Sequence, residues 1–278
     1  MLKEALNATL TSPTNAQLCF IMLDYASFPN QRQALIKDHL QQTGRVVCVQ
    51  LAKQLNVSEH TIRRDLQELA NQGVCKKVYG GAVLNAKNDG SLVQRLDLND
   101  DRKQILAKAC IPYFKEKAFI FIDSGSTNLA IAKMIPQNLE LTVVTHTPSV
   151  AIALQSHEYC DVVLLGGKIS KQQGAAIGTT SLKQLQTMHF DLAILGACAI
   201  DLEVGVSAFD IEDAQFKQAI VKQSNNVLIA VTEEKLSSVA RHKVTDLDSI
   251  SVLITEEKVR EEKLAEFRKL ELQLVFAS

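Results

Sequence analysis

The sequence predicts an α/β protein, in which a small helical domain ends in a β-hairpin and a larger domain is built on a mainly parallel, doubly covered sheet. Two observations support this fold class. Apolar residues recur with helical spacing over residues 46–69, and a Gly-Gly pair follows at residues 80–81. From residue 118 onward, short apolar runs alternate with helical stretches, as in parallel sheets covered by helices on both faces. The expected divisions are a peripheral leader at 1–30, the small domain at 31–84, a linker at 85–100 and the large domain at 101–278.

Residues 1–30 show no pattern of a packed domain. Residues 11–15 read Thr-Ser-Pro-Thr-Asn, which is typical of a loop, and the apolar run at residues 18–23 is far too short to span a bilayer. No basic segment stands directly before a longer apolar core, as a signal peptide requires. We therefore expect a cytoplasmic protein without a membrane partner, in which either Met22 is the biological start or the leader is an unstructured extension.

Charge is distributed unevenly in a chain of otherwise ordinary composition. Of 278 residues, 46% are hydrophobic and 22% are charged, as in a globular protein long enough for two domains. Residues 31–87 contain nine Lys and Arg against four Asp and Glu, whereas the remainder contains 21 against 27. Positive charge is thus concentrated in the small domain, and the near-neutral total argues against a non-specific nucleic-acid-binding protein.

The cysteines and histidines show no metal-binding spacing. Six cysteines stand singly in apolar segments without a Cys-x-x-Cys pair, and the six histidines form no His-Glu-x-x-His motif. We expect free, buried thiols, no metal and no cofactor.

Residues 46–83 are expected to form two short helices, a sharp turn and a hairpin, which together make a winged helix-turn-helix. A preceding helix at residues 31–42 ends before Gly44 and completes a three-helix core. Ser58 follows the turn and is placed to cap the last helix. The apolar positions with helical spacing are Leu51, Leu55, Ile62, Leu66 and Leu69.

The last helix of this domain carries polar residues on the face opposite Ile62, Leu66 and Leu69. A solvated helix face would look the same, but this helix follows a capped turn and precedes a basic Gly-Gly hairpin. The combination favours a recognition helix that enters the major groove of double-stranded DNA. The expected DNA-binding residues are Ser58, Glu59, His60, Thr61, Arg63, Arg64, Lys76, Lys77, Tyr79, Gly80 and Gly81.

These residues resemble the DeoR family of bacterial transcriptional regulators. The wing of that family usually has Arg and His before the glycines, where this chain has Lys77 and Tyr79. Because Lys is a point charge and not a bidentate fork, we expect the wing to contact phosphate and not to read a base. The shared pattern comprises Leu51-Ala52, Val57-Ser58, the Thr-Ile-Arg-Arg-Asp-Leu run at 61–66, and Gly80-Gly81-Ala82.

In the large domain, a helix is expected from Asp100 or Asp101 to about Phe114, followed by a sheet. Ligands of such sheets bind beyond the carboxyl ends of the strands. The C-terminal run is expected to add an edge strand. The expected strands are 119–122, 141–144, 162–165, 192–195, 227–231, 251–254 and 272–276.

The first strand ends in Asp123-Ser124-Gly125-Ser126-Thr127, a small-residue turn that opens a helix. Its backbone N–H groups and hydroxyls can surround a phosphate at the positive end of the helix, although a plain capped turn would have the same sequence. Residues that end the other strands are expected at the same edge. The candidate effector-binding residues are Asp123, Ser124, Gly125, Ser126, Thr127, Thr145, His146, Gly166, Gly167, Asp210, Lys217 and Lys235.

The resemblance to the DeoR family extends over residues 31–278 and implies a sensor domain similar to ribose-5-phosphate isomerase that binds a phosphorylated sugar or polyol. It implies that residues 124–127 hold phosphate, that Asp123 binds a ligand hydroxyl, and that Lys217 and Lys235 place positive charge near the anion. The segments 174–182 and 209–224 resemble the glycerol-3-phosphate repressor branch of that family.

Two departures from the family pattern bear on this site. His146 replaces a common Asn, so an imidazole whose charge varies with pH is expected there. Residues 232–235 read Thr-Glu-Glu-Lys in place of Asp-x-Ser-Lys. The two glutamates would repel a phosphate if they pointed inward, so either they face solvent or the effector differs from that of the family.

We expect a transcriptional regulator that represses genes of carbohydrate or polyol metabolism. It would bind an operator as a homodimer or homotetramer, under the control of a phosphorylated metabolite. The alternative is an isomerase-like enzyme that acts on sugar phosphates through Asp210, Glu212, Asp213 and Lys217. A capped recognition helix with a wing has no use in such an enzyme.

Overall fold

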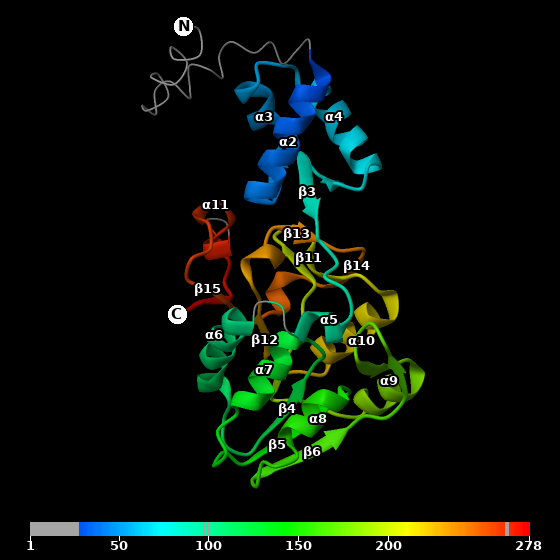
Figure 1. Ribbon diagram of the computed structural model, residues 1–278, viewed down its shortest axis with the longest axis vertical. Helices are drawn as coiled ribbons and strands as arrows, with labels where there is room; N and C mark the ends of the chain where they lie inside the picture. The colour runs from blue at the N-terminus through cyan, green and yellow to red at the C-terminus, as the bar shows by residue number, and fades with distance from the viewer. Residues whose placement is uncertain (1–27, 97, 99, 265–266) are drawn as a thin grey trace, which may run out of the picture. The chain divides into compact units, whose positions relative to one another are not determined.

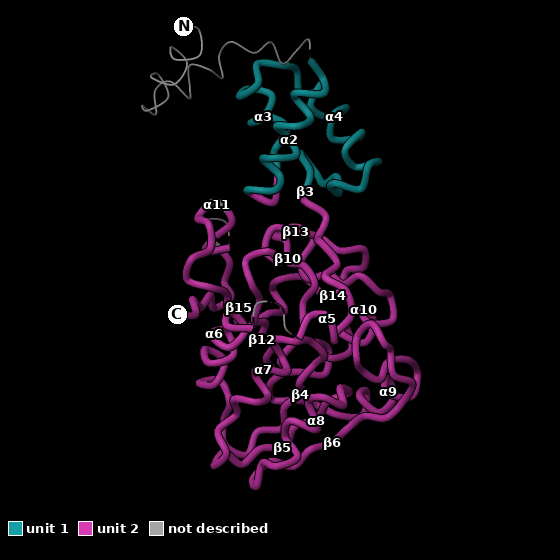
Figure 2. The backbone as a smooth tube through the Cα atoms, viewed as in Figure 1, with its two compact units in different colours: residues 1–42, 46–82 teal, residues 43–45, 83–278 magenta. Residues whose placement is uncertain are grey.

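The computed structural model describes residues 28–96, 98, 100–264 and 267–278, so most of the predicted leader lies outside the described residues (Figure 1). The chain divides into two compact units (Figure 2). One comprises residues 1–42 and 46–82, and the other comprises residues 43–45 and 83–278. In the described residues, no helix is long and apolar enough to cross a membrane.

The first unit is a three-helix core with a hairpin, as the sequence predicts. The turn between its second and third helices passes through Asn56, whose φ of 52° lies in the left-handed region that asparagine tolerates. Ile36, Leu40, Ile62 and Leu69 are fully buried between the helices. The elements are α2 (Pro29–Thr43), β1 (Arg45–Val47), α3 (Cys48–Gln54), α4 (Glu59–Asn71), β2 (Cys75–Val78) and β3 (Gly81–Asn85), in which β1 and β2 both pair with β3.

The second unit contains a seven-stranded sheet in which every neighbouring pair is parallel. Its strand order is β16-β15-β12-β9-β4-β5-β6. Each strand overlaps one of the predicted apolar runs, and the C-terminal strand lies at an edge as expected. The strands are β4 (Ala118–Ile122), β5 (Leu141–Thr145), β6 (Cys160–Leu164), β9 (Leu192–Ile194), β12 (Val227–Ala230), β15 (Val252–Glu256) and β16 (Gln273–Ala277).

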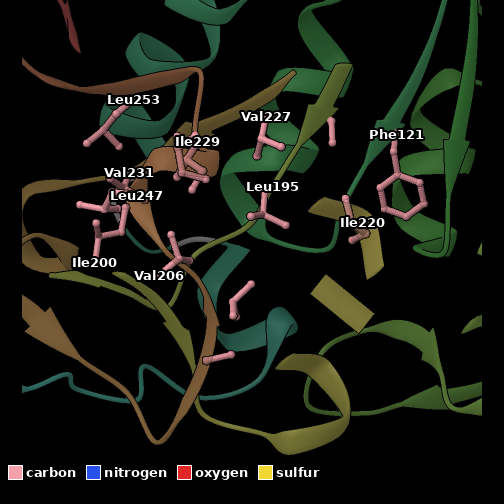
Figure 3. Packing of buried hydrophobic residues seen from close by; sticks show 14 of the residues in the cluster. Phe121, Leu195, Ile200, Val206, Ile220, Val227, Ile229, Val231, Leu247 and Leu253 are labelled. Atoms are coloured by element: carbon pink, nitrogen blue, oxygen red, sulfur yellow. The ribbon is translucent and has the colours of Figure 1, made fainter. Parts of the chain in front are cut away.

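Both faces of this sheet are covered, because alternate residues of its strands enter two separate apolar clusters. On β12, Leu228 and Ala230 pack with α6, α7 and α8, whereas Val227 and Ile229 pack with α9, α10 and a small antiparallel sheet (Figure 3). The helices are α6 (Asp100–Cys110), α7 (Ser126–Met134), α8 (Pro148–Leu154), α9 (Thr179–Leu185) and α10 (Ile211–Lys222), and the small sheet is β10 (Ala199–Asp201), β11 (Gly205–Ala208) and β14 (His242–Thr245).

The stretch predicted as a linker folds onto the second unit. It contains helix α5 (Leu92–Leu96). Leu92 is buried, and the backbone N–H of Leu92 donates to the carbonyl of Gln172 at 2.9 Å. Polar turn residues dominate this stretch and conceal its short apolar helix. The remaining elements are β7 (Lys168–Ser170), β8 (Ala175–Ile177), β13 (Ser238–Val239), α11 (Glu261–Leu264), η1 (Ile111–Tyr113), η2 (Glu233–Lys235), η3 (Leu247–Ser249) and η4 (Phe267–Lys269).

Candidate functional site

Helix α4 presents its predicted polar face to solvent. Ser58 caps it, since the Ser58 hydroxyl accepts a hydrogen bond from the Thr61 backbone N–H at 3.1 Å. Arg63 and Arg64 are exposed, and their ion pairs with described residues are all of the i,i+4 kind, with Nη2 of Arg63 at 3.4 Å from a Glu59 carboxylate oxygen. Exposed pairs of this kind contribute about 0.3–0.5 kcal/mol, so both guanidiniums can exchange them for DNA. His60 is also exposed, and Thr61 is half-buried.

The hairpin of β2 and β3 carries the predicted wing residues. Lys76, Lys77 and Tyr79 are exposed, and Nζ of Lys77 donates to the Gln67 side chain at 2.8 Å. The two glycines differ in role. Gly80 has a φ of 75° and open space around it, whereas a Cβ on Gly81 would lie 1.9 Å from the Val46 carbonyl oxygen. The absence of a side chain at Gly81 therefore allows β3 to pack closely against β1.

Asp123 is the centre of a buried polar cluster beyond the carboxyl ends of β4, β5 and β9. Its carboxylate accepts hydrogen bonds from the backbone N–H groups of Ser124 at 2.7 Å and Gly196 at 2.8 Å. It also forms an ion pair with Lys217 from α10, and Nε2 of His146 lies 3.5 Å from its Oδ1. The sheet thus brings together three residues that are far apart in the sequence.

The charge of Lys217 is matched within the protein. Its Nζ is paired with Asp123 and lies 3.3 Å from Oδ1 of Asp213. Burial acts to lower the pKa of Lys217, but the two carboxylates outweigh burial and raise the pKa above its ordinary value. The ammonium is therefore permanently charged and already compensated. The Oδ2 atom of Asp213 is buried without a hydrogen-bond partner in the described structure.

His146 corrects one prediction from the sequence. Burial, and next the positive charge of Lys217, lower the pKa of His146 to about 3. The ring is 1% exposed and meets the Phe216 ring edge-on, with 4.3 Å between centroids. His146 is therefore neutral near pH 7, and its charge does not vary over the physiological range because burial and the positive charge of Lys217 both disfavour the imidazolium form.

The turn before α7 leaves the N-terminus of this helix without a described side-chain cap, an arrangement called here the open start of α7. Gly125 precedes the helix with a φ of 147°, no side chain caps the helix, and Gly125, Ser126 and Thr127 are half-buried. The amide of Asn128 fixes the turn by donating to the carbonyls of Asp123 at 3.1 Å and Ile194 at 3.3 Å. The first N–H groups of α7 can therefore donate hydrogen bonds to an anion.

Four other predicted residues do not join the cluster around Asp123. The Thr145 hydroxyl donates to the carbonyl of Ile122 at 2.7 Å. Gly166 and Gly167 are exposed beyond β6, and Asp210 is exposed and caps α10 by accepting from the N–H groups of residues 212 and 213. Within the described residues, no hydrogen bond or ion pair joins these residues to Asp123.

The two glutamates of residues 232–235 are paired with cations. Glu234 accepts from Arg102 of α6 at 2.6 Å, and a Glu233 oxygen lies 3.6 Å from Nε of Arg260 and 4.0 Å from Nζ of Lys263. Burial acts to raise the pKa of Glu234, but the hydrogen bonds from Arg102, the backbone and Thr232, together with the positive charge of Arg102, outweigh burial and lower the pKa to about 2. The glutamates are therefore held by neighbouring cations.

The family is identified by comparison with known proteins. A model of the DeoR C terminal sensor domain matches residues 98–257, and a model of the DeoR-like helix-turn-helix domain matches residues 32–88. The chain belongs to the DeoR family. It is therefore a DNA-binding transcriptional regulator, and the alternative of an isomerase-like enzyme is wrong.

Two relatives and one solved structure illustrate the likeness. The HTH-type transcriptional regulator GolR of Listeria innocua is 29% identical over 252 residues, which cover 90% of this chain and 99% of that protein. The glycerol-3-phosphate regulon repressor of Escherichia coli K12 is 30% identical over 224 residues, which cover 80% and 88%. Ribose 5-phosphate isomerase A of Methanocaldococcus jannaschii aligns with a TM-score of 0.36 at 16% identity, covering 49% of this chain and 54% of that one. This TM-score is too low to support a conclusion about this chain.

Sequence reasoning missed three polar residues of this DeoR family member. Arg32 and Asp65 form a buried ion pair between α2 and α4, with 3.0 Å between Nη2 and Oδ1. Arg95 of α5 has a buried Nε without a hydrogen-bond partner in the described structure. The helical spacing 62, 65, 66, 69 could have placed Asp65 on the inner face, whereas no local signal indicates Arg95.

The described cysteines are free thiols, but not all of them are buried. Cys48, Cys75 and Cys110 are buried, whereas Cys160 and Cys198 are partly exposed. The expectation of uniformly buried thiols is therefore wrong for these two, because Cys160 lies on the edge strand β6 and Cys198 lies in the loop beyond β9. Cys19 lies outside the described residues.

Proposed function

We propose that this regulator represses genes of carbohydrate or polyol metabolism and that a phosphorylated sugar or polyol releases it from its operator. The chain would bind double-stranded DNA as a homodimer or homotetramer, because one recognition helix reads too few base pairs for a specific operator. The effector would bind beyond the carboxyl ends of the sensor sheet. Ligand can change operator affinity only by binding the two states of the protein unequally.

The observation that carries this proposal is the open start of α7, which lies at the carboxyl edge of the sensor sheet. The other unit of the same chain has an exposed helix, α4, that suits DNA recognition. A half-buried helix start without a side-chain cap suits a phosphate, and the neighbouring Ser126 and Thr127 hydroxyls can add hydrogen bonds. The relative from Escherichia coli K12 is named for a glycerol-3-phosphate regulon, which agrees with a phosphorylated polyol as effector class.

The DNA-binding part of the proposal is tested by substituting the two exposed arginines of α4. Arg63→Ala or Arg64→Ala should weaken binding to operator DNA by about 1–3 kcal/mol for each lost base contact. Fluorescence anisotropy with a labelled promoter fragment of the regulated genes measures this loss. Arg241→Ala removes an exposed arginine from the other unit and is the matched control. Unchanged affinity in both α4 variants would overturn the recognition-helix assignment.

The effector part is tested at Ser126. Ser126→Asp places a carboxylate where the phosphate would bind and should abolish binding, while the helix start itself tolerates a negative charge. Thermal shift with inorganic phosphate, glycerol 3-phosphate and hexose phosphates measures binding, because a ligand of the folded state raises the Tm. If no phosphate raises the Tm of the unaltered protein, the proposed effector class is wrong. Light scattering of the full chain tests the expected dimer or tetramer.

A further inference from the structure

We infer that Arg95 of helix α5 binds the phosphate of the effector, at the anion site of the proposed function. Nothing in the sequence pattern assigns a role to this residue, which lies in the stretch predicted as a linker. Its Nε is buried and has no hydrogen-bond partner, and its guanidinium makes no ion pair in the described part of the chain. A buried guanidinium nitrogen without a partner is costly, which points to an external acceptor.

Arg95 and Lys235 are two cations of the sensor domain that form no ion pair with a described residue. Arg95 and Lys217 both interact electrostatically with Lys235, which likewise makes no ion pair with a described residue. Lys217 pairs with Asp123 and Asp213, whereas Arg95 and Lys235 form no ion pair with any residue that the structure describes. The thiol of Cys198 and the carboxylate of Asp89 also interact with Lys235, at electrostatic range and without a salt bridge.

The glutamates beside Lys235 do not supply the missing negative charge. Glu233 faces Arg260 and Lys263, and Glu234 faces Arg102, which also pairs with Glu256. Burial is the largest cause of the lowered pKa of Lys235, and the positive charges of Arg95 and Lys217 add to it. A dianionic phosphate would relieve the repulsion among these cations.

The backbone around Arg95 is held in place. Nζ of Lys103 donates to the carbonyls of Arg95 and Leu96, the latter at 3.4 Å. Leu92 is buried against Gly174, where an added Cβ would lie 2.4 Å from Leu92 Cδ2. Helix α5 also contacts α7, the helix whose start is open. Helix α5 is therefore a fixed element that packs against α7.

A guanidinium suits this role better than a second ammonium. Its planar fork can donate two parallel hydrogen bonds to a phosphate, which fixes the orientation of the phosphate as well as its charge. The open N–H groups of α7 and the ammonium of Lys235 would complete the surroundings of the phosphate. This arrangement selects phosphomonoesters over the corresponding uncharged sugars or polyols.

The test compares Arg95→Lys and Arg95→Ala with the unaltered chain, using inorganic phosphate and glycerol 3-phosphate as probes. Isothermal titration should show binding weakened about 10- to 100-fold by Arg95→Ala, and weakened by Arg95→Lys to a lesser degree because charge remains but the fork is lost. Val93→Ala in the same exposed helix surface and Arg241→Ala as a charge-matched change should leave binding unaltered. Operator binding without probe shows whether each variant is folded.

The outcomes separate this inference from the proposed function. If the unaltered protein binds a probe and Arg95→Ala binds it equally well, Arg95 is not a phosphate ligand and the proposed effector class stands. If the unaltered protein binds neither probe nor any other phosphate, both are overturned. A loss that appears equally in Arg95→Ala and Val93→Ala would show that α5 acts only as packing, which also overturns the inference.

Discussion

The ion pair of Arg32 and Asp65 shows how a single buried carboxylate supports the DNA-binding unit. Both side chains are at most 1% exposed, and they connect α2 with α4. Arg64, which precedes Asp65 in the chain, is exposed instead. The position of the exposed face of α4 therefore depends on a contact on its buried side.

Asp65→Ala should destabilise this unit strongly, because it removes a buried carboxylate that pairs with the buried guanidinium of Arg32. The expected loss is about 3–5 kcal/mol in the free energy of unfolding, measured by urea denaturation. Glu68→Ala removes an exposed carboxylate from the same helix and should cost less than about 1 kcal/mol. Equal losses in the two variants would contradict a specific role for the buried pair.

The two glycines of the wing provide a second comparison between single residues. Gly81→Ala places a Cβ against backbone at Val46, so the strands must separate, whereas Gly80→Ala meets only the strain of a positive φ. We expect Gly80→Ala to lower the free energy of unfolding by about 1–2 kcal/mol and Gly81→Ala to lower it by more. Thermal denaturation of both variants checks the order, and a reversed order would show that the wing is not packed as described.

At the scale of elements, η2 is fixed by ion pairs to its neighbours. Arg102 of α6 pairs with Glu234 of η2 and with Glu256 at the end of β15, so one guanidinium joins three elements. Among the described residues, this arrangement leaves Lys235, the last residue of η2, without an ion-pair partner. The state of Lys235 therefore depends on how the neighbouring glutamates are paired.

Arg102→Ala should change how the free energy of unfolding falls at acidic pH. The pKa of Glu234 is about 2 in the folded protein against an ordinary 4.5, so its ion pair stabilises the fold above pH 4.5 and this contribution is lost as pH falls toward 2. The variant should therefore lose less stability than the unaltered protein over this interval. Urea denaturation at pH 6, about pH 4 and about pH 3 measures the difference. Parallel pH profiles would show that Arg102 does not support Glu234.

At the scale of the whole molecule, the uneven charge distribution determines how binding responds to salt. Residues 31–87 have nine basic residues against four acidic ones, while the rest of the chain is net negative. Each phosphate contact made by a basic residue releases a counterion from DNA. Operator affinity should therefore fall with salt, whereas contacts to bases determine sequence preference.

The salt response gives a test of the wing. In a plot of log affinity against log salt concentration, Lys76→Gln or Lys77→Gln should reduce the magnitude of the slope by about 1 for each lost phosphate contact, without changing sequence preference. Anisotropy titrations at several salt concentrations provide the slopes. Arg241→Ala should leave the slope unchanged, and an unchanged slope in both lysine variants would exclude phosphate contacts by the wing.

The sequence by itself determined the elements whose causes are local. Apolar runs such as 227–231 became strands because their β-branched and apolar side chains suit a sheet buried on both faces, and Ser58 caps α4 because its hydroxyl reaches an N–H three residues away. The capped helix, the basic hairpin and the Asp123–Thr127 turn were recognisable for the same reason.

Only the tertiary structure decided which groups meet and which charges remain unmatched. His146 became neutral through burial near Lys217, Asp210 was used as a cap, and the glutamates of η2 were paired by Arg102, Arg260 and Lys263. Arg95 interacts electrostatically with Lys235 from a helix that the packing of Leu92 holds in place. These outcomes depend on partners distant in sequence, and the pKa of a buried group depends on the whole of its surroundings, so no local pattern contains them.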